Sequence, residues 1–219
     1  DVPAADPACV AIEALADRGV INGCDSSANP PLFCPNDPTL RHQMAALIVR
    51  AIPGWANETG QPAFSDNTDD AELMARVGTL QRHGVVRGYQ DEVCQARGLT
   101  PPCYGPLDSV KNGQVLLFIA RAMVLAGYWD LQPDDRTIFP DQNGEAGADP
   151  ASDQQTLDHR MVVTYIHYVG APPDVADIHA PFQRSGVTAG GWSDVSSRSW
   201  FARAFWPSIQ NAFDHDNQP

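Results

Sequence analysis

The chain has 219 residues, of which 43% are hydrophobic and 19% are charged, so it is long and apolar enough to bury a substantial core. Its formal net charge is −13 and its basic residues form no cluster, which excludes the phosphate-binding surface of a nucleic-acid-binding protein. The longest apolar stretch, Val115 to Trp129, contains Arg121 and is too short to cross a bilayer. We therefore expect no membrane insertion.

The cysteine residues indicate an oxidising compartment. Cys24 and Cys34 are ten residues apart, and Cys94 and Cys103 are nine apart. Neither pair has the Cys-x-x-Cys spacing of a zinc or redox site, and neither encloses a histidine. We predict two disulfide bonds, Cys24–Cys34 and Cys94–Cys103, in a secreted protein. Cys9 is left over, and it is either a small buried apolar residue or a thiol that pairs with another chain.

The sequence repeats itself, and the repeat predicts its architecture. Leu15–Gly23 lines up with Leu80–Gly88, 65 positions later, and the first shared glycine of each segment is suited to a left-handed helix end. A second helix follows each cysteine-bearing loop, where Gln43–Ile52 matches Gln114–Met123 at an offset of 71. The six additional residues fall within the second loop, where insertions are well tolerated. We predict an all-α fold of helical hairpins with long disulfide-closed loops.

A third copy begins late in the chain. Phe182–Gly190 repeats the helix end, and Ser197–Phe205 opens a second helix. Between the second and third copies, Phe139–Gly170 contains a predicted helix at Thr156–Val163. This segment is either the remnant of a fourth copy or the long first helix of the last one. The predicted units are residues 1–53, 62–128, 137–170 and 172–213.

Short motifs recur within these units in a fixed order. An aromatic-x-Asp start stands at Phe64–Asp66 and Phe139–Asp141, and Asp1–Pro3 matches it without the aromatic residue. Phe33–Pro35 and Leu40–Gln43 then introduce the second helix of the first copy. The pattern resembles the S-layer homology (SLH) module. That resemblance implies a pseudo-threefold bundle of helical hairpins that holds secreted proteins on the bacterial envelope by binding a cell-wall polysaccharide, often one with acidic pyruvyl groups.

In the SLH family an arginine at the start of the second helix reaches the acidic group of the polymer. A helix start suits an anion because it offers free N–H groups, and a guanidinium can bind a carboxylate through two hydrogen bonds. Arg41 and Arg198 occupy this position, whereas the second copy has Asn112. Trp192 and Trp200 flank Arg198 and could stack on a sugar ring. The alternatives are surface arginines paired with acids and tryptophans that pack between the repeats.

The residues that cap these second helices also depart from the family pattern. Ser197 is the one residue that keeps the capping hydroxyl in place, while Leu40 and Lys111 stand at the equivalent positions. Thr39 could cap its helix one residue early. Gln43 can still close a capping box where the family has glutamate, as can the matching glutamine of the second copy.

Metal binding and catalysis have little support in the sequence. Asp141, Asn143 and Glu145 alternate around a glycine and form a weak calcium candidate, with a solvated acidic loop as the alternative. We expect no other cofactor. The sequence contains no nucleophile elbow, no His-Glu-x-x-His motif and no phosphate-binding loop, so we expect no enzyme.

The function expected from these patterns is that of a secreted module on the bacterial cell surface. It would either bind a wall polysaccharide through Arg41, Arg198 and nearby aromatic residues, or assemble with copies of itself into a layer or filament. The start at Asp1 fits a mature secreted chain. The alternatives are an extracellular carbohydrate-active enzyme and a fragment of a larger envelope protein.

Overall fold

The computed structural model describes residues 1–25, 27–133, 153–170 and 195–216, with side chains at 1–25, 27–133, 160–170 and 195–210. Over these ranges the chain is all-α as predicted, and β-type pairing is limited to isolated bridges. The helices are α1 (Cys9–Asp17), α2 (Arg41–Ala51), α3 (Ala71–Arg82), α4 (Asp91–Ala96), α5 (Asn112–Leu125), α6 (Asp153–Val169) and α7 (Arg198–Asp216).

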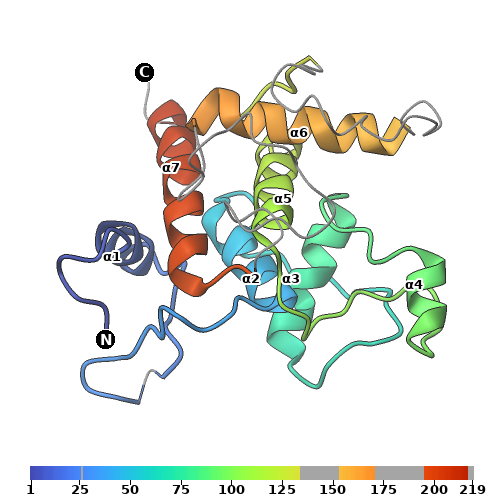
Figure 1. The fold of residues 1–219 in the computed structure, drawn as a ribbon, viewed down its shortest axis with the longest axis horizontal. Coiled ribbons are helices and arrows are strands. Elements are labelled where there is room, and N and C mark those ends of the chain that lie inside the picture. Colours follow the sequence, from blue (N-terminus) through green and yellow to red (C-terminus); the bar gives the residue numbers. More distant parts are fainter. Residues whose placement is uncertain (26, 134–152, 171–194, 217–219) are drawn as a thin grey trace.

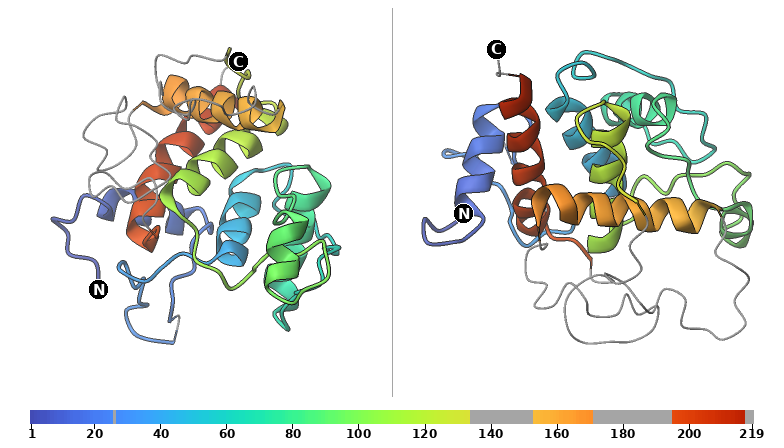
Figure 2. Two further views of the ribbon diagram at one scale, coloured as in Figure 1. Left: turned by 45° about the vertical axis from the view of Figure 1, so that its right-hand side comes forward. Right: turned by 90° about the horizontal axis from the view of Figure 1, so that it is seen from above.

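The helices pack in pairs around a shared core. α1 packs on α7, α2 on α3 and α5 on α6, while α5 also contacts α2 and α7. In Figure 1, α1 and α4 lie at opposite sides of the molecule, with α2, α5 and α7 between them. Figure 2 shows from two further sides that α6 lies beside α5 and α7. The largest fully buried side chains are those of Leu15, Met44, Ile48, Leu80, Tyr104, Leu116, Ile119, Met123, Tyr165, Phe201 and Phe205.

The segments that lead into α2, α5 and α7 form a closed ring of three backbone hydrogen bonds. The Thr39 N–H donates to the carbonyl of Ser196 (2.8 Å), the Ser196 N–H to that of Val110 (2.8 Å), and the Val110 N–H to that of Thr39 (2.9 Å). Each of these residues lies two positions before the first residue of its helix. The ring therefore brings the starts of three helices, far apart in sequence, to one place.

Two of these helices begin with a glutamine side chain folded back onto the backbone. Oε1 of Gln43 accepts a hydrogen bond from the Leu40 N–H (3.2 Å), and Oε1 of Gln114 accepts one from the Lys111 N–H (3.1 Å). This contact is half of a capping box, and it satisfies a backbone donor that the helix itself leaves free. The predicted role of Gln43 is confirmed.

The hydroxyl caps differ between α7 and α2. Ser197 caps α7 as predicted, because its Oγ accepts a hydrogen bond from the Trp200 N–H at 3.2 Å. The prediction that Thr39 caps α2 is wrong, since the residue at the cap position is Leu40. The Thr39 side chain is 1% exposed, and its Oγ1 has no hydrogen-bond partner in the described part of the chain. The hydrogen bonds that the Thr39 backbone makes within the ring hold its side chain away from the helix start.

The glycines predicted to end the first helices adopt the left-handed conformation. Gly19 has φ 67° after α1, and Gly84 has φ 77° after α3. The backbone N–H groups of Val20 and Val85 then bond back to the preceding helix, at Leu15 and Leu80 (both 2.9 Å). A residue with a Cβ is strained at such a φ, which explains the glycine at both positions.

Both predicted disulfide bonds are present. Cys24 pairs with Cys34 across a Cα–Cα distance of 6.0 Å, and Cys94 pairs with Cys103 across 5.7 Å. Two disulfides are typical of a protein that folds in an oxidising compartment. Cys9 is unpaired and partly exposed, so it is not the buried apolar residue of one interpretation.

Several predicted residues lie outside the described ranges. They include the calcium candidate Asp141, Asn143 and Glu145, the aromatic residue Trp192, and the repeat motif Phe182–Gly190. Among the described residues, no group of three or more histidine, cysteine, aspartate or glutamate side chains could hold a metal ion. No helix in these ranges has the length and apolar character needed to cross a bilayer.

Candidate functional site

Two aspartates hold the loops that carry the aromatic residues lying beside Arg41 and Arg198. Each carboxylate accepts hydrogen bonds from two consecutive backbone N–H groups, one of an aromatic residue and one of the residue after it. These bonds join Asp1 to Phe33 (2.8 Å) and Cys34 (2.6 Å), and Asp66 to Tyr104 (2.8 Å) and Gly105 (2.7 Å). Charge-assisted hydrogen bonds of this kind are stronger than neutral ones. Each pair therefore holds an aromatic ring in place beside the start of a helix from another part of the chain.

A pocket of about 200 Å³ opens beside the first of these rings, and we call it the open groove. It lies between the turn after α1, the loop around Phe33, α2 and the start of α7. The Cζ atom of Arg198 lies 5.0 Å from the centroid of the Phe33 ring. The groove is lined by Ile21, Asn22, Gly23, Phe33, Thr39, Gln43, Ala46, Leu47, Arg50, Leu73, Arg198 and Phe201.

Two residues that line the open groove each carry a buried polar atom without a hydrogen-bond partner among the described residues. These atoms are Nε of Arg198 and Oγ1 of Thr39. Burial lowers the pKa of Arg198, and the charge of Asp37 opposes that shift. An unsatisfied buried donor or acceptor costs about 1–3 kcal/mol. A ligand that offers an oxygen to Arg198 and a hydroxyl to Thr39 would recover that free energy.

Arg50 adds a second cation to the open groove. Its Nη2 atom forms an ion pair with Oε1 of Glu72 at 3.0 Å, and the Glu72 side chain is 66% exposed. An ion pair with so exposed a partner contributes little, about 0–1 kcal/mol. Glu72 therefore holds Arg50 only weakly, and Arg50 and Arg198 are two cationic residues on the lining of the open groove.

Arg41 lies in a second site of related construction, which aromatic rings fill and which we call the closed groove. The Arg41 N–H donates to the carbonyl of Asp108 at 2.9 Å, as the Arg198 N–H donates to that of Asp37 at 2.9 Å. Its Cζ atom lies 4.5 Å from the Tyr104 ring centroid, so Tyr104 takes the place that Phe33 has beside Arg198. The fold therefore does not bring Arg41 and Arg198 together. Arg198 lines the open groove, and Arg41 lies in the closed groove.

The closed groove holds Arg41 in a cage of aromatic rings. The residue is 3% exposed, and its Nε donates to the Tyr104 carbonyl at 2.8 Å. The Tyr104 hydroxyl donates in turn to the Arg41 carbonyl at 3.0 Å, and burial raises the pKa of Tyr104 to about 12. Tyr89 and Phe118 lie over the guanidinium at 4.6 and 5.5 Å. These cation–π contacts replace a carboxylate partner, and no ion pair of Arg41 is present among the described residues.

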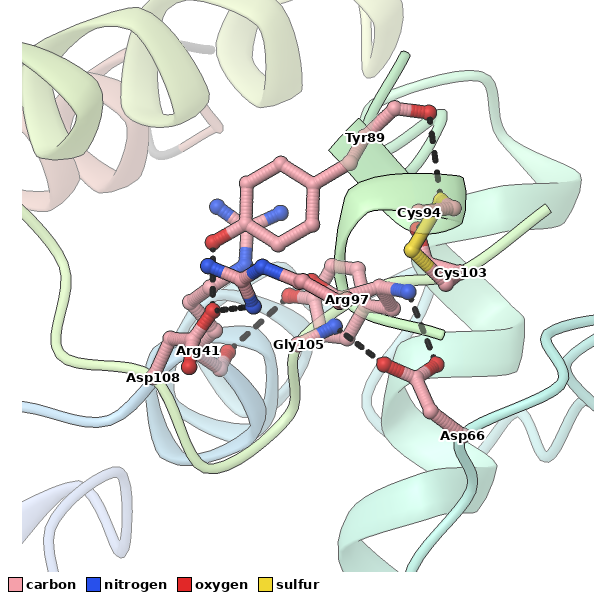
Figure 3. The surroundings of a disulfide bond; sticks show 9 residues. Arg41, Asp66, Tyr89, Cys94, Arg97, Cys103, Gly105 and Asp108 are labelled. Carbon is pink, nitrogen blue, oxygen red and sulfur yellow. Dashed lines mark hydrogen bonds and ion pairs between the residues drawn. A yellow bond between two sulfur atoms is a disulfide. The ribbon is translucent and has the colours of Figure 1, made fainter. Parts of the chain in front are cut away.

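Tyr89 closes this groove, and polar residues hold its ring in place. Its hydroxyl donates to Oδ2 of Asp108 at 2.8 Å, and Arg97 forms an ion pair with the same oxygen (Figure 3). The Cζ atom of Arg97 lies 4.6 Å from the Tyr89 ring centroid. Although burial opposes it, the hydrogen bonds from Arg97 and Tyr89 lower the pKa of Asp108. Burial is also the main reason that the pKa of Tyr89 is raised.

Two substitutions between the copies explain why one groove is open. Cys24 and Tyr89 hold equivalent places, because each follows a left-handed glycine and donates its N–H across the loop, to Leu32 (2.7 Å) or Cys103 (2.8 Å). The Cys24 side chain instead turns into the disulfide with Cys34 and leaves the groove free. The seventh residue of each following helix differs as well, and it is Leu47 in α2 and Phe118 in α5.

Trp200 and Cys9 do not belong to the lining of the open groove. Trp200 is 8% exposed and belongs to the hydrophobic core. Trp192 lies outside the described residues. The Cys9 thiol lies 3.4 Å from Oε1 of Glu13, and that hydrogen bond raises the pKa of Cys9.

Sequence reasoning missed Thr39, Phe33, Arg50 and Tyr89 as members of the grooves. The only available signal was the aromatic-x-Pro motif, which located Phe33 without indicating that it would face an arginine from α7. A comparison of the sequence with protein-family models finds no match, and a comparison with curated proteins finds none either.

Proposed function

We propose that this chain is a non-enzymatic module of a bacterial cell surface, and that it binds an acidic wall polysaccharide in the open groove. One observation carries the proposal. Nε of Arg198 and Oγ1 of Thr39 are both buried, lack partners among the described residues and belong to residues that line one pocket. Folding rarely leaves two such groups without partners on residues that line one pocket, and a ligand with an anionic group and a hydroxyl group supplies both partners.

The dimensions and walls of the groove fit the end of a sugar chain. A volume of about 200 Å³ is smaller than a typical drug-sized pocket and admits roughly one sugar ring. Phe33 and Phe201 give it apolar walls, while Asn22 and Gln43 offer neutral hydrogen-bonding groups. Sugar rings have apolar faces and hydroxyl edges, so this mixture of walls suits them.

The scaffold supports the SLH-like part of the proposal. The closed backbone ring relates the starts of α2, α5 and α7 to one another. Each unit's last helix packs on the first helix of the following unit, and the last unit packs back on the first. The pairs are α2–α3, α5–α6 and α7–α1. In this scheme α6 takes the place of the first helix of the last unit. That arrangement favours three hairpins over a degenerate fourth copy.

The test is co-sedimentation of the full chain with isolated bacterial wall sacculi. We expect the wild type to pellet with sacculi that carry their polysaccharide and not with stripped sacculi. Arg198→Gln removes a charge-assisted hydrogen bond worth about 1.5–3 kcal/mol, so binding should weaken by about tenfold to a hundredfold. Arg82→Gln makes the same charge change on a 53% exposed side chain outside the groove and should bind normally. Equal binding by both variants would contradict the proposal.

Self-assembly is the second candidate, and a different part of the surface favours it. Val10 is 71% exposed on α1, and the neighbouring Cys9 thiol is unpaired. In an oxidising compartment such a thiol can join two chains. Pelleting without sacculi, abolished by Cys9→Ser, would move the proposal from polymer binding to assembly.

A further inference from the structure

The two disulfide bonds differ in how far solvent reaches them. Cys94 and Cys103 are both 0% exposed, whereas Cys24 is exposed and Cys34 is partly exposed. The bonds close loops of similar span, with sequence separations of 9 and 10 residues. Access of the attacking thiolate is one of the factors that set the rate of disulfide reduction, and exposed disulfides are typically the labile ones. The Cys24–Cys34 bond is therefore the one that a thiol reaches in the folded protein.

The exposed disulfide joins two edges of the open groove. Gly23 and Phe33 both line the groove, and the bonded cysteines are the residues that directly follow them. The loop between the cysteines is also held by its own backbone, because the Cys24 N–H donates to the Leu32 carbonyl (2.7 Å) and the Leu32 N–H donates to the Asp25 carbonyl (3.0 Å). The cross-link thus adds a covalent restraint to a short backbone pairing.

The rest of this loop adds little burial, while its two ends are anchored in the core. Exposed loop residues are Asp25, Ser27, Asn29, Pro30 and Pro31. Segments with few buried contacts open at a low cost in free energy. Ile21 and Phe33, on either side of the loop, are 6% and 7% exposed and belong to the hydrophobic core. Breaking the disulfide therefore loosens the loop and leaves the surrounding helices in place.

We propose that the Cys24–Cys34 disulfide is a redox modification site that takes a dithiol as its reactant, and that its reduction loosens the edges of the open groove. The Cys94–Cys103 disulfide is a structural cross-link that stays intact under the same conditions. The two bonds thus have separate roles, one in control of the groove and one in stability.

The exchange balances with the dithiol alone. A thiolate of the dithiol attacks Sγ of the exposed Cys24, the S–S bond breaks, and its electron pair leaves on Sγ of Cys34, which takes up a proton. The second thiolate of the reductant then attacks the mixed disulfide and releases Cys24, which is protonated in turn. The dithiol is oxidised to a disulfide, and the protein gains two thiols.

The first test compares the two disulfides within one folded chain. The full-length protein is treated with dithiothreitol and then with N-ethylmaleimide, and mass spectrometry follows the alkylation of each cysteine. Cys24 and Cys34 should be alkylated at least about tenfold faster than Cys94 and Cys103, because the buried bond reacts only after the structure opens. Equal rates would overturn the proposal. So would a loss of helical circular dichroism when the first bond is reduced.

The second test follows the loop itself. In Cys24→Ser with Cys34→Ser, the amides at positions 24 and 32 should exchange hydrogen at least about tenfold faster than in the wild type, since the cross-link no longer restrains the loop. The matched variant, Cys94→Ser with Cys103→Ser, should leave these two amides unchanged. Unchanged exchange in the first variant would overturn the proposal, and so would its failure to fold.

The effect on ligand binding rests on the proposed function. The reduced protein should bind sacculi about threefold more weakly than the oxidised protein, because binding must then order the edges of the groove. Equal binding by the two forms would show that the disulfide does not control the groove. If neither form binds, the proposed function fails, whereas alkylation and hydrogen exchange still decide the redox site because they use no ligand.

Discussion

The open and closed grooves have the same kind of cation, an arginine at a helix start. They differ in the residue of the facing turn. Each has an arginine at a helix start, an aromatic ring held by an aspartate, and a left-handed glycine in the facing turn. After that glycine, one turn continues with a disulfide-bonded cysteine and the other with a tyrosine. The first arrangement leaves about 200 Å³ of space, and the second fills the groove with protein. The comparison teaches that a repeated scaffold can keep its geometry while two substituted side chains decide whether space remains beside the arginine.

The largest expected effect concerns the aspartates that hold the two loops. Asp66→Ala removes two charge-assisted hydrogen bonds at a partly buried site, and we expect a loss of about 2–4 kcal/mol in the free energy of unfolding. Asp1→Ala should lose less, because Asp1 is exposed whereas Asp66 is partly buried. Urea unfolding of both variants measures the difference.

A suitable control for these two variants is Asp69→Ala. Asp69 is exposed and accepts no hydrogen bond in the described part of the chain. Its replacement should leave the free energy of unfolding nearly unchanged. If Asp66→Ala behaves like Asp69→Ala, the carboxylate does not hold the Tyr104 loop in solution.

The next largest effect is expected when substitutions give the open groove the residues of the closed groove. Cys24→Tyr with Cys34→Gly places a tyrosine and a glycine where the second copy has Tyr89 and Gly105. We expect the new ring to close the open groove and to weaken polysaccharide binding by at least about tenfold. Co-sedimentation with sacculi measures the change.

The matched control is Cys24→Ser with Cys34→Gly, which loses the same disulfide but introduces no ring. Both variants should lose about 2–3 kcal/mol of stability with the ten-residue cross-link, so their comparison isolates the ring. Equal binding by the two variants would mean that the side chain at position 24 does not control access to Arg198.

The smallest expected effect is a pH dependence of the closed groove. The pKa of Asp108 is lowered in the folded state, so its ionised form stabilises the protein above the ordinary aspartate pKa of about 3.9. This stabilisation is lost as the pH falls through the lower folded value. The Asp108 side chain is 36% exposed, so we expect a modest change, visible as a steeper fall in urea midpoint below about pH 4.

Asp37 provides the comparison for that experiment, because its carbonyl bonds to Arg198 as that of Asp108 bonds to Arg41. The Asp37 side chain is exposed and has no ion pair among the described residues. Asp108→Asn should flatten the acid dependence more than Asp37→Asn does, because Asp108 has an ion pair and Asp37 has none among the described residues. The reverse result would show that Arg97 and Tyr89 do not hold Asp108 in its ionised form.

The local features of the fold were predictable from the sequence because they depend on short-range chemistry. Gly19 and Gly84 end helices where only a glycine is unstrained, and Ser197 caps α7 with its own hydroxyl. The cysteine spacing and its position in the repeat identified both disulfides. In each case the interacting residues lie within about ten positions of one another.

The candidate site was less predictable because its contacts join distant segments. Arg41 meets Tyr104 and Arg198 meets Phe33 only after the backbone ring has gathered three helix starts. A sequence pattern places an arginine at a helix start but not the ring that faces it. For the same reason Thr39 was considered as a cap, whereas its backbone belongs to the ring and its buried hydroxyl has no partner among the described residues.

The most direct test of the central proposal observes the Nε–H group of Arg198. In a ¹⁵N-labelled full chain this NMR resonance can be assigned by its absence in Arg198→Lys, and followed while soluble wall polysaccharide is added. We expect a saturable shift of the Arg198 resonance as a ligand oxygen meets the buried donor, with the Arg41 resonance unmoved behind Tyr89. If the polysaccharide binds while the Arg198 resonance stays unchanged, the ligand does not occupy the open groove and the proposal is wrong.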